Sequence, residues 1–119
     1  MNKQIYESNL LLNSIIESIN NLKGKDIISL DLRRIESSIF KYFIICTGNS
    51  NIHVNAIQKN ITKNIANKLK EKPWHVEGEK TSDWVLIDYS DIIVHIFQDN
   101  IRQLYKLEEL WGDAIITHY

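Results

Sequence analysis

The sequence predicts a single compact α/β domain in which a mixed five-stranded sheet packs against helices. Its 119 residues are a length that usually forms one hydrophobic core. Hydrophobic periodicity changes along the chain in the order helix, two strands, helix, three strands, helix. A strand that returns through a long helix to another strand allows a right-handed crossover with parallel pairing, whereas a hairpin is antiparallel. Because the chain has one proline and no internal repeat, we expect no domain boundary within residues 1–119.

The first predicted element is an amphipathic helix over residues 4–22, within an N-terminal helical segment that spans residues 1–24. Apolar side chains recur there at spacings of three and four, and Gly24 follows as a stop signal. The apolar positions are Ile5, Leu11 or Leu12, Ile15, Ile19 and Leu22.

Two strands are predicted next. The stretch "DIISLDL" alternates between apolar and polar residues, which is typical of a half-buried strand. The stretch "KYFIICTG" is apolar on both faces and rich in residues that favour strands, so we expect an interior strand covered on both sides. In the first of these strands, one face comprises Ile28, Leu30 and Leu32, and the other Ser29 and Asp31.

A long helix is expected over about residues 51–71, where the hydrophobic period changes from two to about 3.6. Ser50 or Asn51 is placed to cap its start, and Pro73 is expected to stop it. Its apolar stripe comprises Ile57, Ile61, Ile65 and Leu69.

The C-terminal half begins with a brief strand, "WHVEG", which is followed by a hairpin and a helix. The hairpin is "WVLIDYSDIIVHIF", residues 84–97. The helix is "NIRQLYKLEELWGD", which we expect to end near Gly112. Its apolar face comprises Ile101, Leu104, Leu107 and Trp111.

The hairpin has two unlike faces, because side chains alternate along each strand. The aliphatic face needs a helix to cover it. The mixed face combines aromatic anchors with charge at its margin, which is typical of a protein interface. The alternative is that Trp84 and His95 pack beneath a helix, with His95 neutral and hydrogen-bonded, and periodicity does not decide between the two. The aliphatic face comprises Val85, Ile87, Ile92 and Val94, and the mixed face Trp84, Leu86, Asp88, Ile93, His95 and Phe97.

The register of the hairpin stays open on sequence alone. Ser90 is a mediocre residue for a left-handed turn position, and a bulge at residues 89–90 would shift the pairing. The simple even register pairs Trp84 with His95, Leu86 with Ile93, and Asp88 with Asp91.

Composition narrows the classes of function. The chain has 14 basic and 15 acidic residues, so its net charge gives no global reason to expect nucleic-acid binding. Its single cysteine, Cys46, cannot form an intramolecular disulfide or a cysteine-based zinc cage, and we expect it to be a buried apolar residue. No run of ~18 apolar residues occurs. We therefore expect a cytoplasmic protein that does not contact a membrane.

Sequence motifs for catalysis are weak in this chain. The turn at residues 47–50, "TGNS", could hold an anion, but no aspartate lies between Asp31 and Asp83 to supply the metal-binding carboxylates of a nucleotidyltransferase. The four histidines lie far apart and form no pair at helical spacing. A triad of Ser90, His95 and Asp88 lacks a nucleophile elbow. We therefore predict no catalytic residue, no cofactor and no metal site.

Five lysines accompany the long helix and could contact RNA phosphates. Such lysines more often form the solvated side of an amphipathic helix. A weak RNA contact is therefore the lesser of two interpretations. The lysines are Lys59, Lys63, Lys68, Lys70 and Lys72.

Four blocks of sequence, "YFIICTGNSNIHVNAI", "PWHVEG", "DWVLIDYSDIIVHIF" and "LYKLEELWGDA", together resemble the ribosomal silencing factor family, also called RsfS or Iojap-related proteins. The resemblance covers roughly residues 26–114, the family-like core. It implies a non-enzymatic translational repressor that binds the large ribosomal subunit through large-subunit ribosomal protein fourteen and blocks association with the small subunit. It also implies a fold similar to nucleotidyltransferases without their catalytic residues, and a homodimer off the ribosome.

The resemblance places the partner-binding surface on the "WVLIDYSD" block and the strand after it. Trp84 and Leu86 would be the apolar anchors. Asp88 and Asp91 would be acidic partners for basic side chains of the ribosomal protein. Further matching positions that would flank this surface are Glu77, Tyr89, His95, Tyr105, Glu108 and Trp111.

Two positions depart from the family pattern. Lys41 stands where the family commonly has aspartate, and Ser90 where many members have glycine. Two alternative functions stay open. One is a nucleotidyltransferase-like enzyme that uses residues 48–50 with Asp88 and Asp91, and the other is a self-associating interaction module with no ribosomal role.

Overall fold

The computed structural model of the chain describes residues 3–119, with side chains described from residue 9 onward. Ile5, the first position of the predicted apolar helix face, lies outside the described side chains. No helix in this part of the chain is both long and apolar enough to cross a membrane. The strands are β1 (Lys25–Asp31), β2 (Tyr42–Gly48), β3 (His75–Glu77), β4 (Trp84–Asp88), β5 (Ile92–Gln98) and β6 (Ile115–His118). The helices are α1 (Lys3–Asn21), α2 (Asn51–Leu69), α3 (Asp99–Tyr105) and α4 (Leu107–Leu110).

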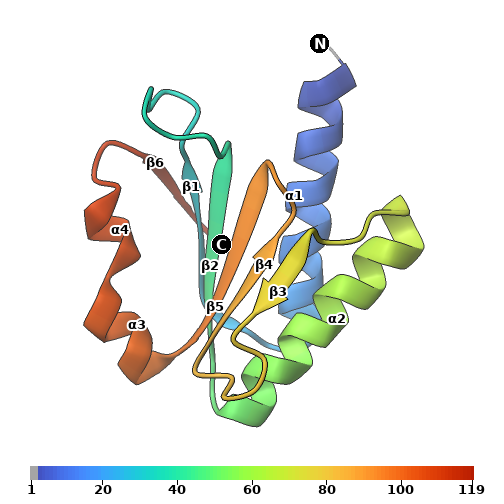
Figure 1. The fold of residues 1–119 in the computed structure, drawn as a ribbon, viewed down its shortest axis with the longest axis vertical. Coiled ribbons are helices and arrows are strands. Elements are labelled where there is room, and N and C mark those ends of the chain that lie inside the picture. The colour runs from blue at the N-terminus through green and yellow to red at the C-terminus, as the bar shows by residue number, and fades with distance from the viewer. Residues whose placement is uncertain (1–2) are drawn as a thin grey trace.

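The strands form one sheet in the order β3-β4-β5-β2-β1-β6 (Figure 1). At its centre, β2 and β5 run parallel, and each other neighbouring pair runs antiparallel. The chain leaves β2 through α2 and returns to β5 by way of β3 and β4, which produces the predicted mixed sheet. The predicted number of five strands is wrong, because β6 adds a sixth strand at the edge beside β1.

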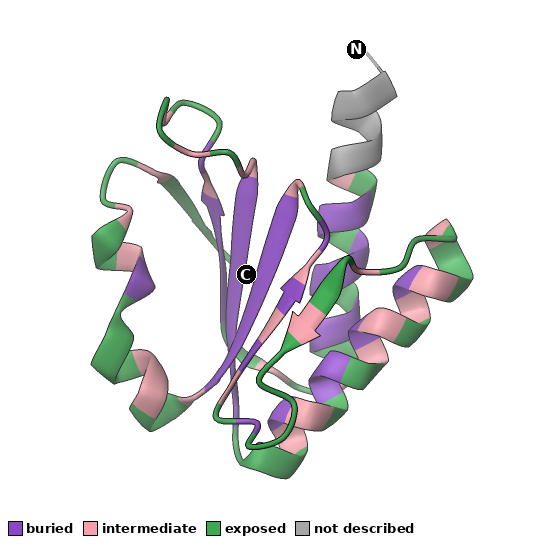
Figure 2. Cartoon of the chain, viewed as in Figure 1, coloured by how far each residue is buried: buried purple, intermediate pink, exposed green. Residues whose placement is uncertain are grey.

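Helices cover both faces of the sheet (Figure 1). α1 and α2 pack on one face, and the predicted aliphatic side of the hairpin lies beneath them. α3 and α4 pack on the other face, around Phe43, Ile45 and Phe97. The central strands β2 and β5 are buried along almost their whole length, as Figure 2 shows. The prediction of an interior strand is therefore confirmed for β2, and Cys46 in it is fully buried, which raises the pKa of its thiol to about 12.

α2 begins where the sequence predicts and ends two residues early. The Ser50 Oγ accepts a hydrogen bond from the His53 amide at 3.1 Å, so Ser50 is the cap. Lys70 adopts the left-handed conformation, with φ 58°, and ends the helix at Leu69. Pro73 therefore follows the end of the helix and does not cause it.

The predicted last helix is in fact two short helices. Lys106 between them has φ 47°, and its amide donates to the Arg102 carbonyl. Leu107 and Trp111 pack on the sheet as predicted, but Leu104 is 73% exposed. The reason is that the left-handed residue ends the helical period that the four predicted positions would otherwise share.

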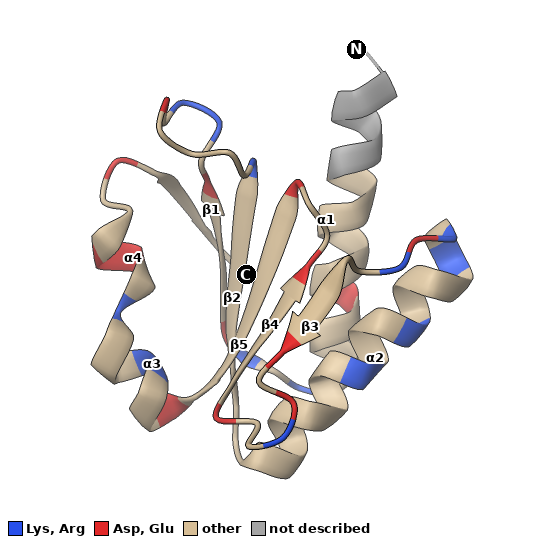
Figure 3. Cartoon of the chain, in the orientation of Figure 1, with Lys and Arg blue, Asp and Glu red and all other residues tan. Residues whose placement is uncertain are grey.

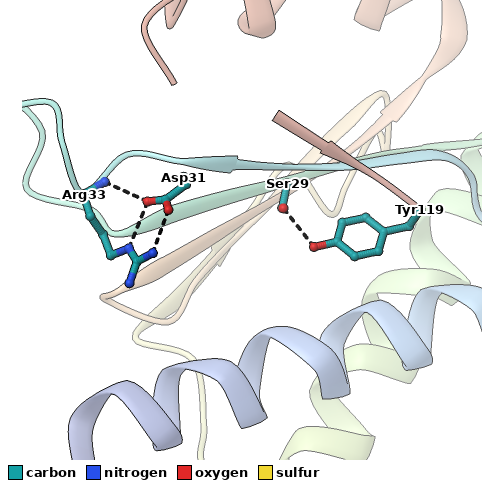
Figure 4. Close-up of polar contacts among 4 residues, drawn as sticks. All are labelled: Ser29, Asp31, Arg33 and Tyr119. Carbon is teal, nitrogen blue, oxygen red and sulfur yellow. Dashed lines mark hydrogen bonds and ion pairs between the residues drawn. The ribbon is translucent and has the colours of Figure 1, made fainter. Parts of the chain in front are cut away.

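β6 pairs antiparallel with β1 and is extended by the last residue. The Tyr119 amide donates to the Ile27 carbonyl at 2.9 Å, and the Tyr119 hydroxyl is hydrogen-bonded to the Ser29 Oγ at 2.9 Å (Figure 4). Ser29 is only 4% exposed. The prediction that this face of β1 is solvated is therefore wrong at Ser29. At the far end of β1, hydrogen bonds from Arg33 hold the pKa of the Asp31 carboxyl below its usual range (Figure 4).

The hairpin turns one residue later than the even register requires. The Tyr89 amide donates to the Ile92 carbonyl at 2.9 Å, and Ser90 in the turn has φ 75°. The even register is therefore wrong by two residues. Because side chains alternate with a period of two, this shift leaves the membership of the two faces unchanged. The observed pairs are Trp84 with Phe97, Leu86 with His95, and Asp88 with Ile93.

Candidate protein-binding surface

β4 is buried on one face and accessible on the other. Val85 and Ile87 lie in the core that α1 and α2 cover. Trp84, Leu86 and Asp88 lie on the opposite face and are partly exposed. α3 contacts the central strands β5 and β2, and β4 and β3 continue the sheet from β5 to its edge (Figure 1). The accessible side chains of β4 therefore lie beside these helices and not beneath them.

Trp84 is partly exposed and held in place by its neighbours. Its ring stacks on Phe97, with centroids 4.8 Å apart and planes at 28°. It also contacts the ring of Tyr105 on α3, with centroids 4.8 Å apart. Its Nε1 donates a hydrogen bond to the Nδ1 of His95 at 3.1 Å. Tyr105 is 50% exposed, so the two rings together present aromatic surface to solvent.

The turn that leads into β4 depends on Gly78. This residue has φ 88°, and a Cβ placed on it would lie 2.0 Å from the carbonyl oxygen of Trp84. A side chain is therefore excluded where the chain passes close to β4. This close approach is a structural reason for glycine at position 78, in the turn that leads into β4.

Acidic side chains border the apolar part of the face. Glu77 lies opposite Leu86 and His75 opposite Asp88, so all four side chains share one face. The His75 Nε2 lies 3.2 Å from the Glu77 Oε1, and its Nδ1 lies 3.6 Å from the Asp88 Oδ2. The Asp88 Oδ1 accepts the amide of Ser90 at 2.7 Å, which fixes this carboxylate at the turn. The β3–β4 face is defined here as Glu77, Trp84, Leu86, Asp88 and Tyr105.

His95 supports the β3–β4 face from beneath. It is 4% exposed, lies edge-on to Phe43 at 4.7 Å, and burial lowers the pKa of its imidazole to about 4. Since Nδ1 accepts the Trp84 proton, the neutral ring carries its own proton on Nε2, for which the described residues offer no hydrogen-bond partner. The packed, neutral interpretation is therefore correct for His95. The ring is 4% exposed in the free chain, and its predicted role as a flanking contact with a partner stays a prediction.

Two predicted carboxylates are paired within the chain. The Asp91 Oδ2 lies 3.3 Å from the Nζ of Lys41, the residue that departs from the family pattern. The Glu108 Oε1 lies 3.5 Å from the Nε of Arg102. Asp91 stays partly exposed, so its role toward a partner remains a prediction. Glu108 contributes to the packing of α4 and does not border the β3–β4 face.

Two predicted aromatic contacts pack into the cores instead. Tyr89 is 7% exposed and lies in the core that α1 and α2 cover, where burial raises the pKa of its hydroxyl. Trp111 packs edge-on against Phe43, with centroids 5.6 Å apart. Tyr89 therefore lies on the opposite side of the sheet from Trp84, and its predicted flanking contact with a partner stays a prediction.

The residues of the alternative enzyme are not assembled. Gly48 pairs with Gln98 at the end of β5, whereas Asp88 pairs with Ile93 near its start. Five residues of strand separate the two pairs, which is about 16 Å. The turn at residues 48–50 and Asp88 therefore cannot act together on one small substrate. Within the described part of the chain, no group of three or more His, Cys, Asp or Glu residues is placed to hold a metal ion.

Two side chains near the β3–β4 face were not predicted. His75 joins its acidic border, and Trp74 is 79% exposed with its amide donating to the Asp88 carbonyl at 2.7 Å. Alternation within "HVE" carries the signal that identifies His75, because residues two apart in a strand share a face. His75 thus shares a face with Glu77.

Comparisons with known proteins agree on one family. A family model described as "Ribosomal silencing factor during starvation" matches residues 5–118. The chain is similar to the ribosomal silencing factor RsfS of Haemophilus influenzae, with 39% identity over 102 residues that cover 86% of this chain and 98% of that protein. It is 41% identical to RsfS of Bacillus subtilis over 92 residues, which cover 77% and 76% of the two chains. A crystal structure of a Chromobacterium violaceum protein superposes with a TM-score of 0.82 at 33% identity, covering 87% of this chain and 85% of that one.

Proposed function

The chain belongs to the family of ribosomal silencing factors, and we propose that it represses translation by binding the large ribosomal subunit through large-subunit ribosomal protein fourteen. Bound there, it blocks association with the small subunit. The proposed activity is binding, without catalysis. The family relation and the resemblance of the "WVLIDYSD" block support the partner, and the β3–β4 face supports the mode of contact.

The observation that carries this proposal is the exposed aromatic and apolar surface at Trp84, Leu86 and Tyr105. Tryptophan and tyrosine are enriched among the residues that dominate protein binding energies. The Trp84 ring is already fixed by stacking on Phe97 and by its hydrogen bond to His95. Little side-chain entropy is therefore lost when a partner covers it.

The charge at the border favours a basic partner. The Glu77 side chain is 68% exposed, and the Asp88 side chain is 20% exposed. Lysine or arginine side chains of a ribosomal protein would meet these carboxylates at the rim, where opposite charges orient a complex and speed its formation. A phosphate backbone would be repelled there, so we propose that this face binds protein and not RNA.

Off the ribosome, we propose that the protein forms a homodimer. Analytical ultracentrifugation of the purified chain checks this proposal. A monomer at micromolar concentration would contradict it without affecting the ribosomal contact.

Substitution of the aromatic anchors tests the proposed contact. Removal of a central aromatic anchor costs ~2–4 kcal/mol of binding free energy, which raises the dissociation constant roughly 30- to 900-fold. Trp84→Ala should reach this range, and Tyr105→Ala should weaken binding by at least about tenfold. Tyr105→Ala is the cleaner variant because the residue is half-exposed, whereas Trp84 also packs on Phe97. The measurement is co-sedimentation of each variant with isolated large subunits.

The matched control is Ile39→Ala, which removes an 86% exposed apolar side chain between β1 and β2. This control should bind as the wild type does. Addition of small subunits to the same gradients measures subunit joining, which the wild type should reduce and Tyr105→Ala should restore. A wild-type chain that stays at the top of the gradient refutes the ribosomal role. Binding that free ribosomal protein fourteen does not compete away refutes the proposed partner.

A further inference from the structure

A second surface lies on α2, on the side of the helix that faces away from its buried residues. The buried positions of α2 are Val54, Ile57, Gln58, Ile61 and Ile65. At about 100° per residue, Lys59 and Lys63 project in the opposite direction, and both are exposed. They lie one helical turn apart and therefore form a line of positive charge along the outside of the helix.

The charge of this line is not balanced within α2. The helix contains no aspartate or glutamate among its 19 residues. Lys68 is paired with Glu17 of α1 at 3.3 Å, whereas Lys59 and Lys63 have no ion pair with any side chain that the structure describes. Figure 3 shows Lys and Arg segments along α2 and on into the loop that leads to β3.

The loop after α2 continues the basic line and adds an aromatic ring. Lys70 and Lys72 are exposed there, with Glu71 between them as the one acidic residue. Trp74 follows and is 79% exposed, although its amide is bound to the carbonyl of Asp88 at 2.7 Å. A large aromatic ring is thus held by a fixed backbone and left in solvent.

Trp74 is the last residue of the loop between α2 and β3. It lies two residues after Lys72 in the chain and directly before His75, the first residue of β3. The aromatic ring therefore follows the exposed lysines of this loop closely along the chain. The α2 lysine surface is defined here as Lys59, Lys63, Lys70, Lys72 and Trp74.

We propose that the α2 lysine surface binds an unpaired strand of RNA, with lysine ammonium groups against the phosphates and a base stacked on Trp74. A line of cations that ends in an exposed, fixed aromatic ring is the combination that single-stranded nucleic acid requires. An acidic protein would match the lysines but would leave the ring without a specific role. This inference goes beyond the proposed function, because it concerns a different ligand and a different surface.

The test measures binding of the full chain to a fluorescein-labelled oligouridylate of about 12 nucleotides by fluorescence anisotropy, at several salt concentrations. Loss of two phosphate contacts should make the plot of log affinity against log salt less steep by about 1.4, so Lys59→Gln combined with Lys63→Gln should show this change. Trp74→Ala should weaken binding roughly 5- to 150-fold, the range for loss of one stacked base. Trp74→Phe should retain most of the affinity, since it keeps an aromatic face.

The matched control is Arg34→Gln combined with Lys106→Gln, which removes two charges at exposed positions outside α2. This double variant should keep the wild-type affinity and salt dependence. Equal losses in the two double variants would show that only net charge matters and would overturn the proposal. Wild-type binding that does not depend on salt, or an unchanged affinity of Trp74→Ala, would overturn it as well.

Two further measurements distinguish RNA binding by this surface from membrane binding and from the proposed contact with the ribosomal protein. Binding to phosphatidylserine vesicles but not to the RNA would assign the surface to a membrane and overturn the RNA proposal. Tyr105→Ala should keep full RNA affinity while it loses affinity for the large subunit. Failure of the ribosomal-protein contact and failure of the RNA contact are therefore seen in different variants.

Discussion

His95 shows how one buried side chain sets the geometry of an exposed one. Its Nδ1 receives the Trp84 Nε1–H at 3.1 Å, and its ring lies against Phe43. This bond requires an unprotonated Nδ1. The position of the Trp84 ring therefore depends on the charge state of a buried residue.

Acid should destabilise the fold through His95. The pKa of its imidazole is about 4 in the folded chain and 6.5 as the reference value, so the unfolded chain takes up the proton first as pH falls. The contribution of neutral His95 to the free energy of unfolding is therefore fully present above pH ~6.5. It falls by up to ~3 kcal/mol as the pH is lowered from ~6.5 to ~4. Urea unfolding of the wild type and of His95→Asn between pH 7.5 and 4 measures it. The variant keeps an acceptor for Trp84 without titrating in this range, and parallel pH profiles of the two proteins would contradict the expectation.

At the scale of an element, the turn of the β4–β5 hairpin depends on the backbone conformation of Ser90. Ser90 occupies φ 75°, a conformation that favours glycine. The Asp88 carboxylate compensates by accepting the Ser90 amide at 2.7 Å. The family resemblance implies glycine at this position in many members, and the positive φ of Ser90 is a physical reason for such a preference.

Ser90→Gly should stabilise the protein. Relief of the left-handed backbone at this residue contributes about 1 kcal/mol, which corresponds to a rise of about 3 to 6 °C in Tm for a chain of this length. Thermal unfolding followed by circular dichroism measures the shift. The matched control is Ser37→Gly, at an exposed serine that is not among the residues with positive φ, and it should lower Tm or leave it unchanged. A lower Tm for Ser90→Gly would refute this account of the turn.

The elements that the sequence predicts well are those whose period is long and uninterrupted. α1, β2, α2 and the two faces of the hairpin follow from apolar spacing alone. The break at Lys106 and the turn at Ser90 depend on single residues with positive φ, for which neither lysine nor serine is a signal. β6 was missed because its four residues follow a helix closely and are exposed, so they show no alternation between buried and solvated positions.

The candidate surface was predictable only in part, because alternation along a strand gives the face of a side chain but not how deeply that side chain is buried. Alternation places Trp84, Leu86 and Asp88 on one face, and the structure agrees. It cannot tell how far α3 and α4 extend over that face, so it leaves the burial of His95 open. The burial of His95 depends on α3 and α4, which follow it in the chain and pack around Phe43 and Phe97 beside it.

At the scale of the whole molecule, β6 protects the edge of the sheet at β1. Four residue pairs join the two strands, and Tyr119 adds bonds to Ile27 and Ser29. The opposite edge, β3, has only three residues and carries His75 and Glu77. Both devices limit association through exposed strand edges.

Removal of residues 115–119 should loosen β1 selectively. Loss of several hydrogen bonds at about 0.5–1.5 kcal/mol each lowers the free energy of unfolding by roughly 2–4 kcal/mol. Amide hydrogen exchange should become faster for the β1 amides that face β6, and should stay slow in β4 relative to the new global stability. Tyr119→Phe is the matched control, because it removes only the hydroxyl bond to Ser29. Unchanged protection of β1 after truncation would show that β6 does not protect this edge.

The parallel pairing of β2 with β5 also determines when β2 can pair during synthesis of the chain. Tyr42 pairs with Ile92 and Gly48 with Gln98, so each partner lies 50 residues further along the chain, from 92 − 42 and 98 − 48. Closing a loop of that length costs about 3.5 kcal/mol of chain entropy, whereas the β4–β5 hairpin closes locally. During synthesis at about 5–20 residues per second, β2 leaves the ribosome about 3 to 10 s before the strand that completes its pairing. β2, which is buried along its whole length in the folded chain, therefore stays without this partner strand during that interval, and nascent-chain chaperones should engage it.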